Sequence, residues 1–203
     1  MEEVKIGNQI WMKSNLDVET FKNGDVIIQA ISREHWNELR ESETPAWCFY
    51  KFDSNNYEKC GKLYNKFALI DSRGLAPEGW HIPSDEEWNL LAETLGGQDI
   101  AADKLKALNT WEGYEETDDD DNPTGVFISD NANNLSGFTA LPTGQCHFHG
   151  QFFDKDNACY FWTSDLGDNN HPIFRAIYCG YSDLARDNEN SVYAASIRCV
   201  KDN

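Results

Sequence analysis

Two histidines flank a single phenylalanine in His147-Phe148-His149. On a β-strand, residues two apart point to the same face, so both imidazoles could ligate one zinc or copper ion if a third ligand joined them. No carboxylate lies at a spacing that would supply that ligand. The pattern therefore favours two solvent-facing histidines on a hairpin, and we expect no metal there.

Four consecutive carboxylates, Asp118 to Asp121, offer the hard oxygen ligands that calcium prefers. The run lacks the glycine and the closing glutamate of an EF-hand loop, and the Glu-Pro-Asn and Trp-Asn-Asp signatures of calcium-dependent sugar-binding lectins are absent. Trp162-Thr163-Ser164-Asp165 is only a distant counterpart of the second signature. We therefore predict a solvated acidic loop and no cofactor.

The six cysteines are Cys48, Cys60, Cys146, Cys159, Cys179 and Cys199. None lies in the short-spaced clusters that structural zinc sites use. Their even number favours an oxidising compartment, but cysteine is also an ordinary core residue, so both interpretations stay open. Cys48 and Cys60 enclose a short loop between aromatic segments, and we expect them to form a disulfide. The pairing of the other four cysteines stays open.

His81 lies between Trp80 and Ile82, just before the start of a predicted helix. A catalytic role would need a nucleophile in a setting such as Gly-x-Ser-x-Gly, and the sequence contains none. We expect His81 to pack or form hydrogen bonds where the helix begins.

The stretch from Trp162 to Asn190 differs in kind from the rest of the chain, because it mixes tyrosine with small polar and charged residues. Tyrosine gives rigid contact area, and small polar residues give adaptable hydrogen bonds, as in antibody binding loops. The alternative is that surface loops are polar in any protein. We predict a ligand-binding surface made of Trp162, Asp165, Asn169, Asn170, His171, Tyr178, Tyr181, Asp183 and Arg186.

Two helices precede that surface in the chain. Ser84 and Glu87 match a capping box, and Trp88, Leu91 and Leu95 then follow on one face, which predicts a helix over 84–95. A second helix is expected over 99–108, with Leu105 and Leu108 buried. A shorter one is expected over 31–41, and residues 113–137 form a long polar excursion. Strands are expected at 4–12, 47–50, 61–64, 138–141, 146–153, 158–163, 174–180 and 191–200, so the fold class is α+β.

The formal net charge is -18, from 35 acidic and 17 basic residues. Nucleic acids and anionic membrane surfaces are bound mainly through Lys and Arg, so neither is an expected partner. No stretch approaches the length and apolarity of a membrane span. The segment from Met1 to Lys5 lacks the basic and apolar regions of a signal peptide. Either the protein is not exported by that route or a signal was removed from this sequence.

Several sequence blocks together span nearly the whole chain, and the most specific of them is Gly79-Trp80-His81-Ile82-Pro83-Ser84. This block and those given next resemble the Fibrobacter succinogenes major paralogous domain family. The others include Gly7-Asn8-Gln9-Ile10-Trp11-Met12, Trp47-Cys48-Phe49-Tyr50, Cys60-Gly61-Lys62-Leu63-Tyr64-Asn65, Ser136-Gly137-Phe138-Thr139-Ala140-Leu141-Pro142-Thr143-Gly144, Phe161-Trp162-Thr163-Ser164 and Ser196-Ile197-Arg198-Cys199-Val200-Lys201-Asp202. The blocks contain no lipobox, and Cys146, Cys159 and Cys179 lie outside them.

The resemblance implies one C-type-lectin-like domain over 1–203, in which the N- and C-terminal strands pair and the late loops present a ligand surface. It also implies a Bacteroidetes cell-surface or extracellular address, often as a lipoprotein, and no general catalytic activity. We therefore expect a non-catalytic recognition module for a protein or glycan, with Trp11, Trp47, Trp80, Trp88 and Trp162 buried. One alternative is an enzyme distantly related to formylglycine-generating enzymes, which use a reactive cysteine pair near the C-terminus. Cys179 and Cys199 lie in that part of the chain, but the residues around them do not match the enzyme's motif. The other is a structural module of a surface lipoprotein, pilus or phage particle.

Overall fold

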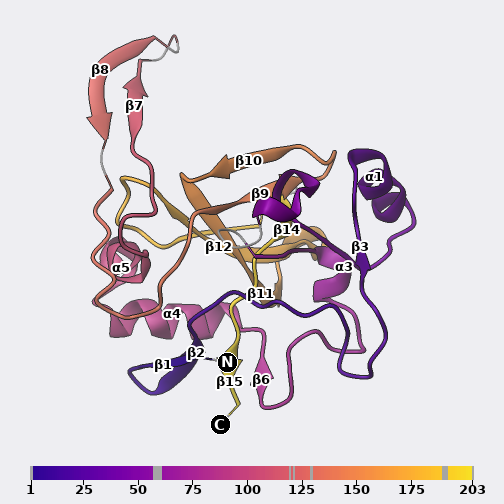
Figure 1. Cartoon of the computed structure of the whole chain (residues 1–203). Helices are drawn as coiled ribbons and strands as arrows, with labels where there is room; N and C mark the ends of the chain where they lie inside the picture. Colours follow the sequence, from indigo (N-terminus) through magenta and orange to yellow (C-terminus); the bar gives the residue numbers. More distant parts are fainter. Residues whose placement is uncertain are drawn as a thin grey trace.

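A computed structural model describes residues 2–56, 61–118, 120, 122–128, 130–188 and 192–202. The described α-helices all lie before Lys106, and mostly antiparallel strands precede and follow them, which confirms the α+β fold class. The chain ends lie close together at the bottom of Figure 1, below a layer formed by helices α4 (Asp85–Thr94) and α5 (Gln98–Leu105). Helix α1 (Arg33–Glu41) and the short helix α3 (Lys66–Leu69) lie on the right-hand side in the same view.

Helix α4 begins as the sequence predicts. The side chain of Ser84 accepts a hydrogen bond from the backbone N–H of Glu87, and the carboxylate of Glu87 accepts one from the N–H of Ser84. Trp88 and Leu91 are fully buried on its inner face. Helix α5 ends three residues earlier than expected, so Leu108 lies beyond it and is 53% exposed, and the expectation that Leu108 is buried was wrong.

A small sheet joins the two ends of the chain. Strand β1 (Glu3–Ile6) forms a hairpin with β2 (Gln9–Met12), and β15 (Val200–Lys201) pairs with both β2 and β6 (Trp80–His81). Val200 lies opposite Trp11 in an antiparallel register, which confirms the predicted pairing of the terminal strands. His81 is carried by β6 at the point where this sheet meets helix α4.

The larger sheet contains nine described strands and forms the centre of the molecule. Late strands form one end of it, and strands from the first third of the chain form the other. In spatial order the path is β13 (Ala185–Asp187), β12 (Pro172–Tyr178), β11 (Ala158–Leu166), β9 (Thr143–His147), β14 (Val192–Ala195), β5 (Leu63–Asn65), β4 (Ala46–Cys48) and β3 (Ile28–Gln29), and β10 (Phe152–Lys155) pairs with β9 off this path.

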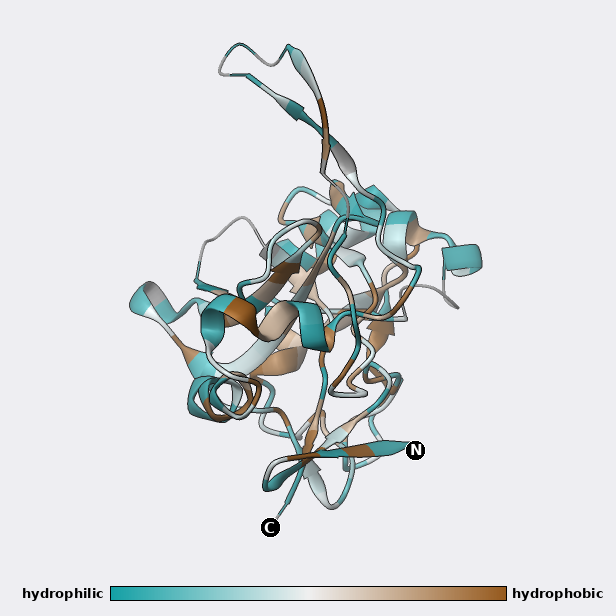
Figure 2. Cartoon of the chain, turned by 90° about the vertical axis from the view of Figure 1, so that its left-hand side faces the viewer, coloured by the Kyte–Doolittle hydropathy of each residue, from teal (hydrophilic) through white to brown (hydrophobic). Residues whose placement is uncertain are grey.

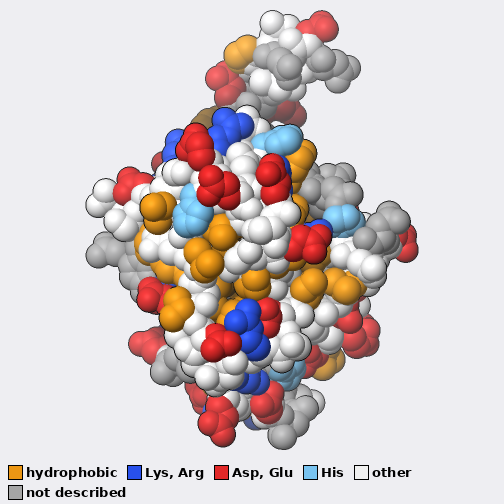
Figure 3. Space-filling view, turned by 90° about the vertical axis from the view of Figure 1, so that its right-hand side faces the viewer, with side chains coloured by type: hydrophobic (Ala, Val, Ile, Leu, Met, Phe, Trp, Pro, Cys, Tyr) orange, Lys and Arg blue, Asp and Glu red, His pale blue; other side chains and the backbone are white. Residues whose placement is uncertain are grey.

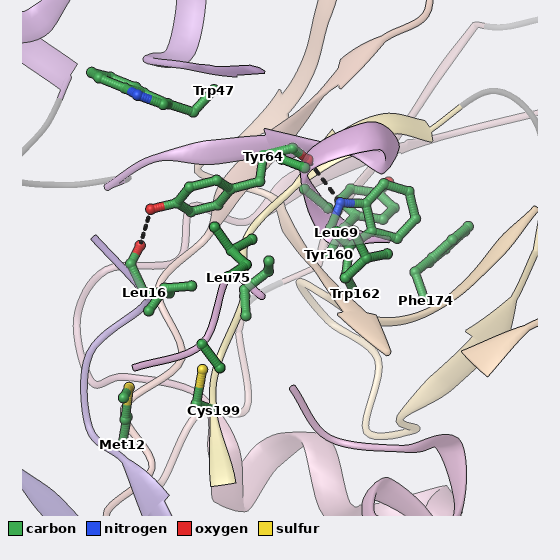
Figure 4. Close-up of a cluster of buried hydrophobic side chains, with 14 of the residues drawn as sticks. Met12, Leu16, Trp47, Tyr64, Leu69, Leu75, Tyr160, Trp162, Phe174 and Cys199 are labelled. Atoms are coloured by element: carbon green, nitrogen blue, oxygen red, sulfur yellow. Dashed lines mark hydrogen bonds between the residues drawn. The ribbon is translucent and has the colours of Figure 1, made fainter. Parts of the chain in front are cut away.

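Successive side chains of strand β11 point alternately into two hydrophobic clusters on opposite sides of the sheet. Tyr160 and Trp162 pack with Tyr64 and Phe174 on one side of the sheet, where Figure 4 shows the Nε1–H of Trp162 donating to the carbonyl of Tyr64. Cys159 and Phe161 pack on the other side, against the helices. The five tryptophans expected in the core are all buried, with exposed fractions of 7% or less: Trp11, Trp47, Trp80, Trp88 and Trp162.

One glycine in β9 is required by a close backbone approach. Gly144 has a φ of +66°, and a Cβ there would lie 2.4 Å from the carbonyl oxygen of Phe153 on the paired strand β10. Any larger residue would force β9 and β10 apart. This accounts physically for the glycine in the Leu141-Pro142-Thr143-Gly144 block.

Residues 113–137 are not an irregular excursion throughout. Strands β7 (Tyr114–Thr117) and β8 (Pro123–Ile128) form a two-stranded hairpin, which we call the arm, and it stands clear of the body in Figures 1 and 2. The polar composition hid the strand pattern. Val126 and Phe127 on β8 are exposed, with 48% and 66% of their surfaces accessible.

The face that carries α1, α3 and β3 shows hydrophobic side chains among many acidic ones in Figure 3. Ile31, between β3 and α1, and Ile70, directly after α3, are more than half exposed. Within the described ranges, every helix is too short or too polar to cross a bilayer.

Candidate functional site

Strands β11 and β12 separate the predicted ligand-binding residues into two groups. Ala158 lies opposite Tyr178 at one end of this antiparallel pair, and Leu166 lies opposite Pro172 at the other. The seven residues of β12 span roughly 20 Å at about 3.4 Å per residue. We call the group formed by Tyr178, Tyr181 and Asp183 the tyrosine end. Asp165, Asn170 and His171 lie towards the other end, and Arg186, opposite the middle of β12, is joined to Asp165 through Asp85; we call these four residues the arginine end. The predicted residues therefore do not form one continuous face.

Trp162 belongs to neither group, because it is 1% exposed and lies in the core beside Tyr64. Its inclusion in the ligand-binding set was wrong, since a side chain occupied with the core cannot contact a ligand. Asn169 lies in the 3-10 turn η3 (Asp168–Asn170) between β11 and β12, next to the exposed Asn170. His171 follows that turn and is half-buried, and burial together with the charge of Lys66 lowers its pKa.

The arginine end is organised around Asp85, the first residue of α4. The buried Arg175 of β12 donates to Asp85 Oδ1 from Nε at 2.9 Å and from Nη2 at 2.6 Å. Arg186 donates from Nε to Asp85 Oδ2 at 2.7 Å, and the backbone N–H of Asp85 donates to Asp165 Oδ2 at 2.6 Å. Two of the predicted site residues, Asp165 and Arg186, are thus occupied in fastening helix α4 to the sheet.

The tyrosine end presents an exposed aromatic side chain beside a small hollow. Tyr181 is 54% exposed, and its ring centroid lies 6.5 Å from that of the half-buried Tyr178. The hydroxyl of Tyr160 donates to Asp154 at 2.7 Å, and burial raises the pKa of Tyr160. A hollow of about 220 Å³ is lined by Tyr178, Tyr181, Asp154, Asn157, Ala158 and Cys179.

Lys106 holds the loop that carries Tyr181, and sequence reasoning missed it. Its side chain is fully buried, and its ammonium group donates to the carbonyl of Tyr181 at 2.9 Å. The same group lies 3.1 Å from Asp130 and 3.5 Å from Asp103. Lys106 lay inside a predicted helix, where a lysine is normally solvated, so nothing in its sequence context indicated burial.

Trp111 was also missed, although a tryptophan just after a predicted helix was an available signal. It is 8% exposed, and its ring centroid lies 5.5 Å from the ammonium of Lys106. Two hollows, of about 360 and 320 Å³, share Asn109 and Trp111 in their linings. The backbone N–H of Glu112 donates to Asp156 in the turn before β11, which places these hollows beside the tyrosine end.

The described cysteines are buried, and no disulfide bond joins any two of them. Cys48 and Cys146 lie in one hydrophobic cluster. Burial, and to a smaller extent a hydrogen bond with Cys48, raises the pKa of Cys146. Cys60 lies outside the described residues, so its disulfide with Cys48 stays a prediction. Cys179 and Cys199 belong to different clusters, and burial raises the pKa of Cys199 to about 12.

The two candidate metal sites differ in their geometry. The ring centroids of His147 and His149 lie 5.9 Å apart, at the end of β9 and in the turn after it. Among the described residues, no three His, Cys, Asp or Glu side chains form a cluster that could hold a metal ion. In the acidic run, Asp118 Oδ1 accepts from the backbone N–H groups of Asp120 and Asn122, while residues 119 and 121 lie outside the described part.

The fold and the arrangement of these residues define a mixed α+β domain whose terminal strands pair and whose late strands leave two chemically distinct ends. The sequence model of the Fibrobacter succinogenes major domain matches residues 4–201. The chain belongs to that family. No curated protein and no solved structure matches it.

Proposed function

We propose that this protein is a non-catalytic recognition domain with a C-type-lectin-like fold, which binds a protein or glycan ligand at its tyrosine end. The observation that carries the proposal is the exposed ring of Tyr181, beside one hollow of about 220 Å³ and near two larger ones. Concave surfaces with aromatic walls and a few polar groups are typical of binding sites.

The loop of Tyr181 is held in place before any ligand arrives. The ammonium group of Lys106 donates a hydrogen bond to the carbonyl of Tyr181, and the backbone N–H of Ala102 in helix α5 donates to the carbonyl of Ser182. Binding loses less conformational entropy when the contact residues are already ordered. The pairing of β15 with β2 and the two central helices support the C-type-lectin-like comparison.

The thiols support a binding function over the enzyme alternative. A reactive cysteine needs a lowered pKa and access to substrate. Burial instead raises the pKa of both Cys179 and Cys199, and the exposed fraction of each side chain is 2% or less. By resemblance to its family we also propose a cell-surface or extracellular location, which a lipobox in the upstream codons of the native gene would test.

The experiment is a titration of ¹⁵N-labelled protein, followed by NMR, with two probe sets. One contains methyl glycosides of glucose, galactose, mannose and N-acetylglucosamine, and the other contains tetrapeptides with acidic, basic or apolar side chains. We expect one set to shift amides around Tyr181. Tyr181→Ala should weaken that binding at least about tenfold, which corresponds to 1.4 kcal/mol.

Arg186→Ala is the matched control, because Arg186 is also exposed but lies at the arginine end. It should bind like the wild type. Shifts confined to the arginine end, or unchanged affinity in a natively folded Tyr181→Ala variant, would show that the wrong end has been chosen.

A further inference from the structure

The hollow of about 360 Å³ beside Trp111 has walls of two kinds. Trp111, Leu141 and Pro142 supply apolar surface, and Asn109, Glu112 and Asp156 supply polar side chains. None of these three polar side chains forms a hydrogen bond with another described residue. The hollow thus combines one apolar wall with hydrogen-bonding groups that the fold does not use.

The frame of the hollow is fixed by the backbone. The N–H of Glu112 donates to the carbonyl of Asp156 at 2.8 Å, and the N–H of Asp156 donates to Pro142 at 2.9 Å. The indole Nε1–H of Trp111 donates to the carbonyl of Ala140 at 3.2 Å. A ligand would therefore enter a site that is already formed, which favours affinity.

The surrounding charges disfavour an anionic ligand. The buried ammonium of Lys106 is neutralised by Asp130 and Asp103, which lie 3.1 and 3.5 Å from it, so it does not attract an anion to the hollow. A ligand anion would meet Glu112 and Asp156, and the sequence contains no Lys or Arg from 107 to 154 to attract it.

The volume sets the size of the ligand, since binding pockets commonly measure about 300–1,000 Å³ and this hollow is near the lower limit. We propose that it binds one pyranose ring of a glycan without an anionic group, with the C–H face of the sugar on the apolar wall that Leu141, Pro142 and the accessible edge of Trp111 form, and with its hydroxyls on Asn109, Glu112 and Asp156. The neighbouring hollow of about 320 Å³, which shares Asn109 and Trp111, has room for the next sugar. This assignment deepens the proposed function and rests on it.

Two positions allow a side chain to be removed without straining the backbone. Asn109 and Asp156 have φ values of 59° and 71°, which glycine adopts readily. Asn109→Gly and Asp156→Gly therefore remove a hydrogen-bonding group and should keep the fold. Asn170→Gly is the matched control, since Asn170 is exposed with a φ of 57° but lies at the arginine end.

Calorimetry with the four neutral methyl glycosides, together with glucosamine and glucuronate as charged probes, tests the proposal. We expect at least one neutral glycoside to bind with a dissociation constant on the order of 1 mM. Asn109→Gly and Asp156→Gly should each weaken it at least about fivefold, since each removes one hydrogen bond. Asn170→Gly should leave it unchanged, and glucuronate should bind more weakly than the neutral glycosides and glucosamine.

The proposal is overturned if no neutral glycoside binds saturably at millimolar concentration, if glucuronate binds more tightly than the neutral glycosides, or if all three glycine variants weaken binding equally. Tetrapeptide binding at Tyr181 without any glycoside binding would retain the proposed function and reject the pyranose site. Failure of both probe sets at the tyrosine end would reject both.

Discussion

Trp88 is the residue whose replacement should cost the most stability among the tryptophans of the core. It is fully buried, and its ring centroid lies 4.8 Å from Trp11, 5.4 Å from Phe161 and 5.8 Å from Phe138. Trp88→Ala would remove the side chain that connects helix α4 to strand β2, strand β11 and Phe138. We expect a large loss of unfolding free energy without a change of fold.

The magnitude follows from the burial. A tryptophan removes up to about 250 Å² from water, which at about 25 cal/mol per Å² gives an upper bound of about 6 kcal/mol. Alanine recovers part of that area, and the cavity relaxes only partly, so the expected cost of Trp88→Ala is about 3–5 kcal/mol. Loss of the aromatic contacts with Trp11 and Phe161 is part of this cost.

Trp88→Phe is the control that separates ring packing from the indole nitrogen. The Nε1–H of Trp88 is buried and has no hydrogen-bond partner in the described part of the chain. Removing an unpaired polar group recovers desolvation free energy and partly offsets the smaller ring, so Trp88→Phe should cost at most about 2 kcal/mol. Urea denaturation with unchanged m-values measures both variants. A cost below about 1 kcal/mol for Trp88→Ala would refute the packing argument.

Three further predictions concern buried or paired ionisable groups. Burial lowers the pKa of Arg198 to about 9, and its guanidinium group donates to the carbonyls of Phe138 and Met12. Arg198→Met should therefore lower the unfolding free energy, measured by urea denaturation, by about 2–4 kcal/mol. A change within about 0.5 kcal/mol would contradict this prediction. Partial burial lowers the pKa of His81, but hydrogen bonds with Glu87 and Asp202, each 2.7 Å long, outweigh this and raise it above 6.5. The protonated His81 therefore contributes its full stabilisation below about pH 6.5, and this is lost as the pH rises through the folded-state pKa. The difference in unfolding free energy between the wild type and His81→Gln should shrink over that range. A difference that stays constant with pH would count against the pairing. Burial also raises the pKa of Cys159 and Cys199, so iodoacetamide at neutral pH should alkylate them only after unfolding; rapid labelling of the native protein, read by mass spectrometry, would show that these thiols are accessible.

The sequence predicted the features that depend on local patterns. The capping box at Ser84 and Glu87 needs only residues three apart, and the structure confirms both hydrogen bonds. The buried tryptophans follow from size and apolarity. The pairing of the terminal strands came from the family resemblance, because no local pattern relates Trp11 to Val200.

The candidate site was harder to predict because it depends on register. Tyr181 and Arg186 are five residues apart in the sequence, yet Tyr181 lies beyond the end of β12 at Tyr178, whereas Arg186 lies opposite Arg175 in the middle of that strand. Lys106 is buried only because Asp130 and the carbonyl of Tyr181 meet it from distant segments. The arm was missed because Tyr114–Thr117 and Pro123–Ile128 border an acidic run that reads as a loop.

A polar side chain that forms hydrogen bonds within the fold contributes to stability, whereas one without such a partner is available to a ligand. Asp156 lies in the turn before β11, and Asp165 lies near the end of that strand. Asp165 accepts the backbone N–H that begins helix α4, whereas the carboxylate of Asp156 has no partner among the described residues. Substituting Asp165 should therefore change stability first, because the N–H of Asp85 would lose its acceptor. Substituting Asp156 should leave stability nearly unchanged, because water satisfies its carboxylate in the free protein, and any effect should appear in ligand affinity alone.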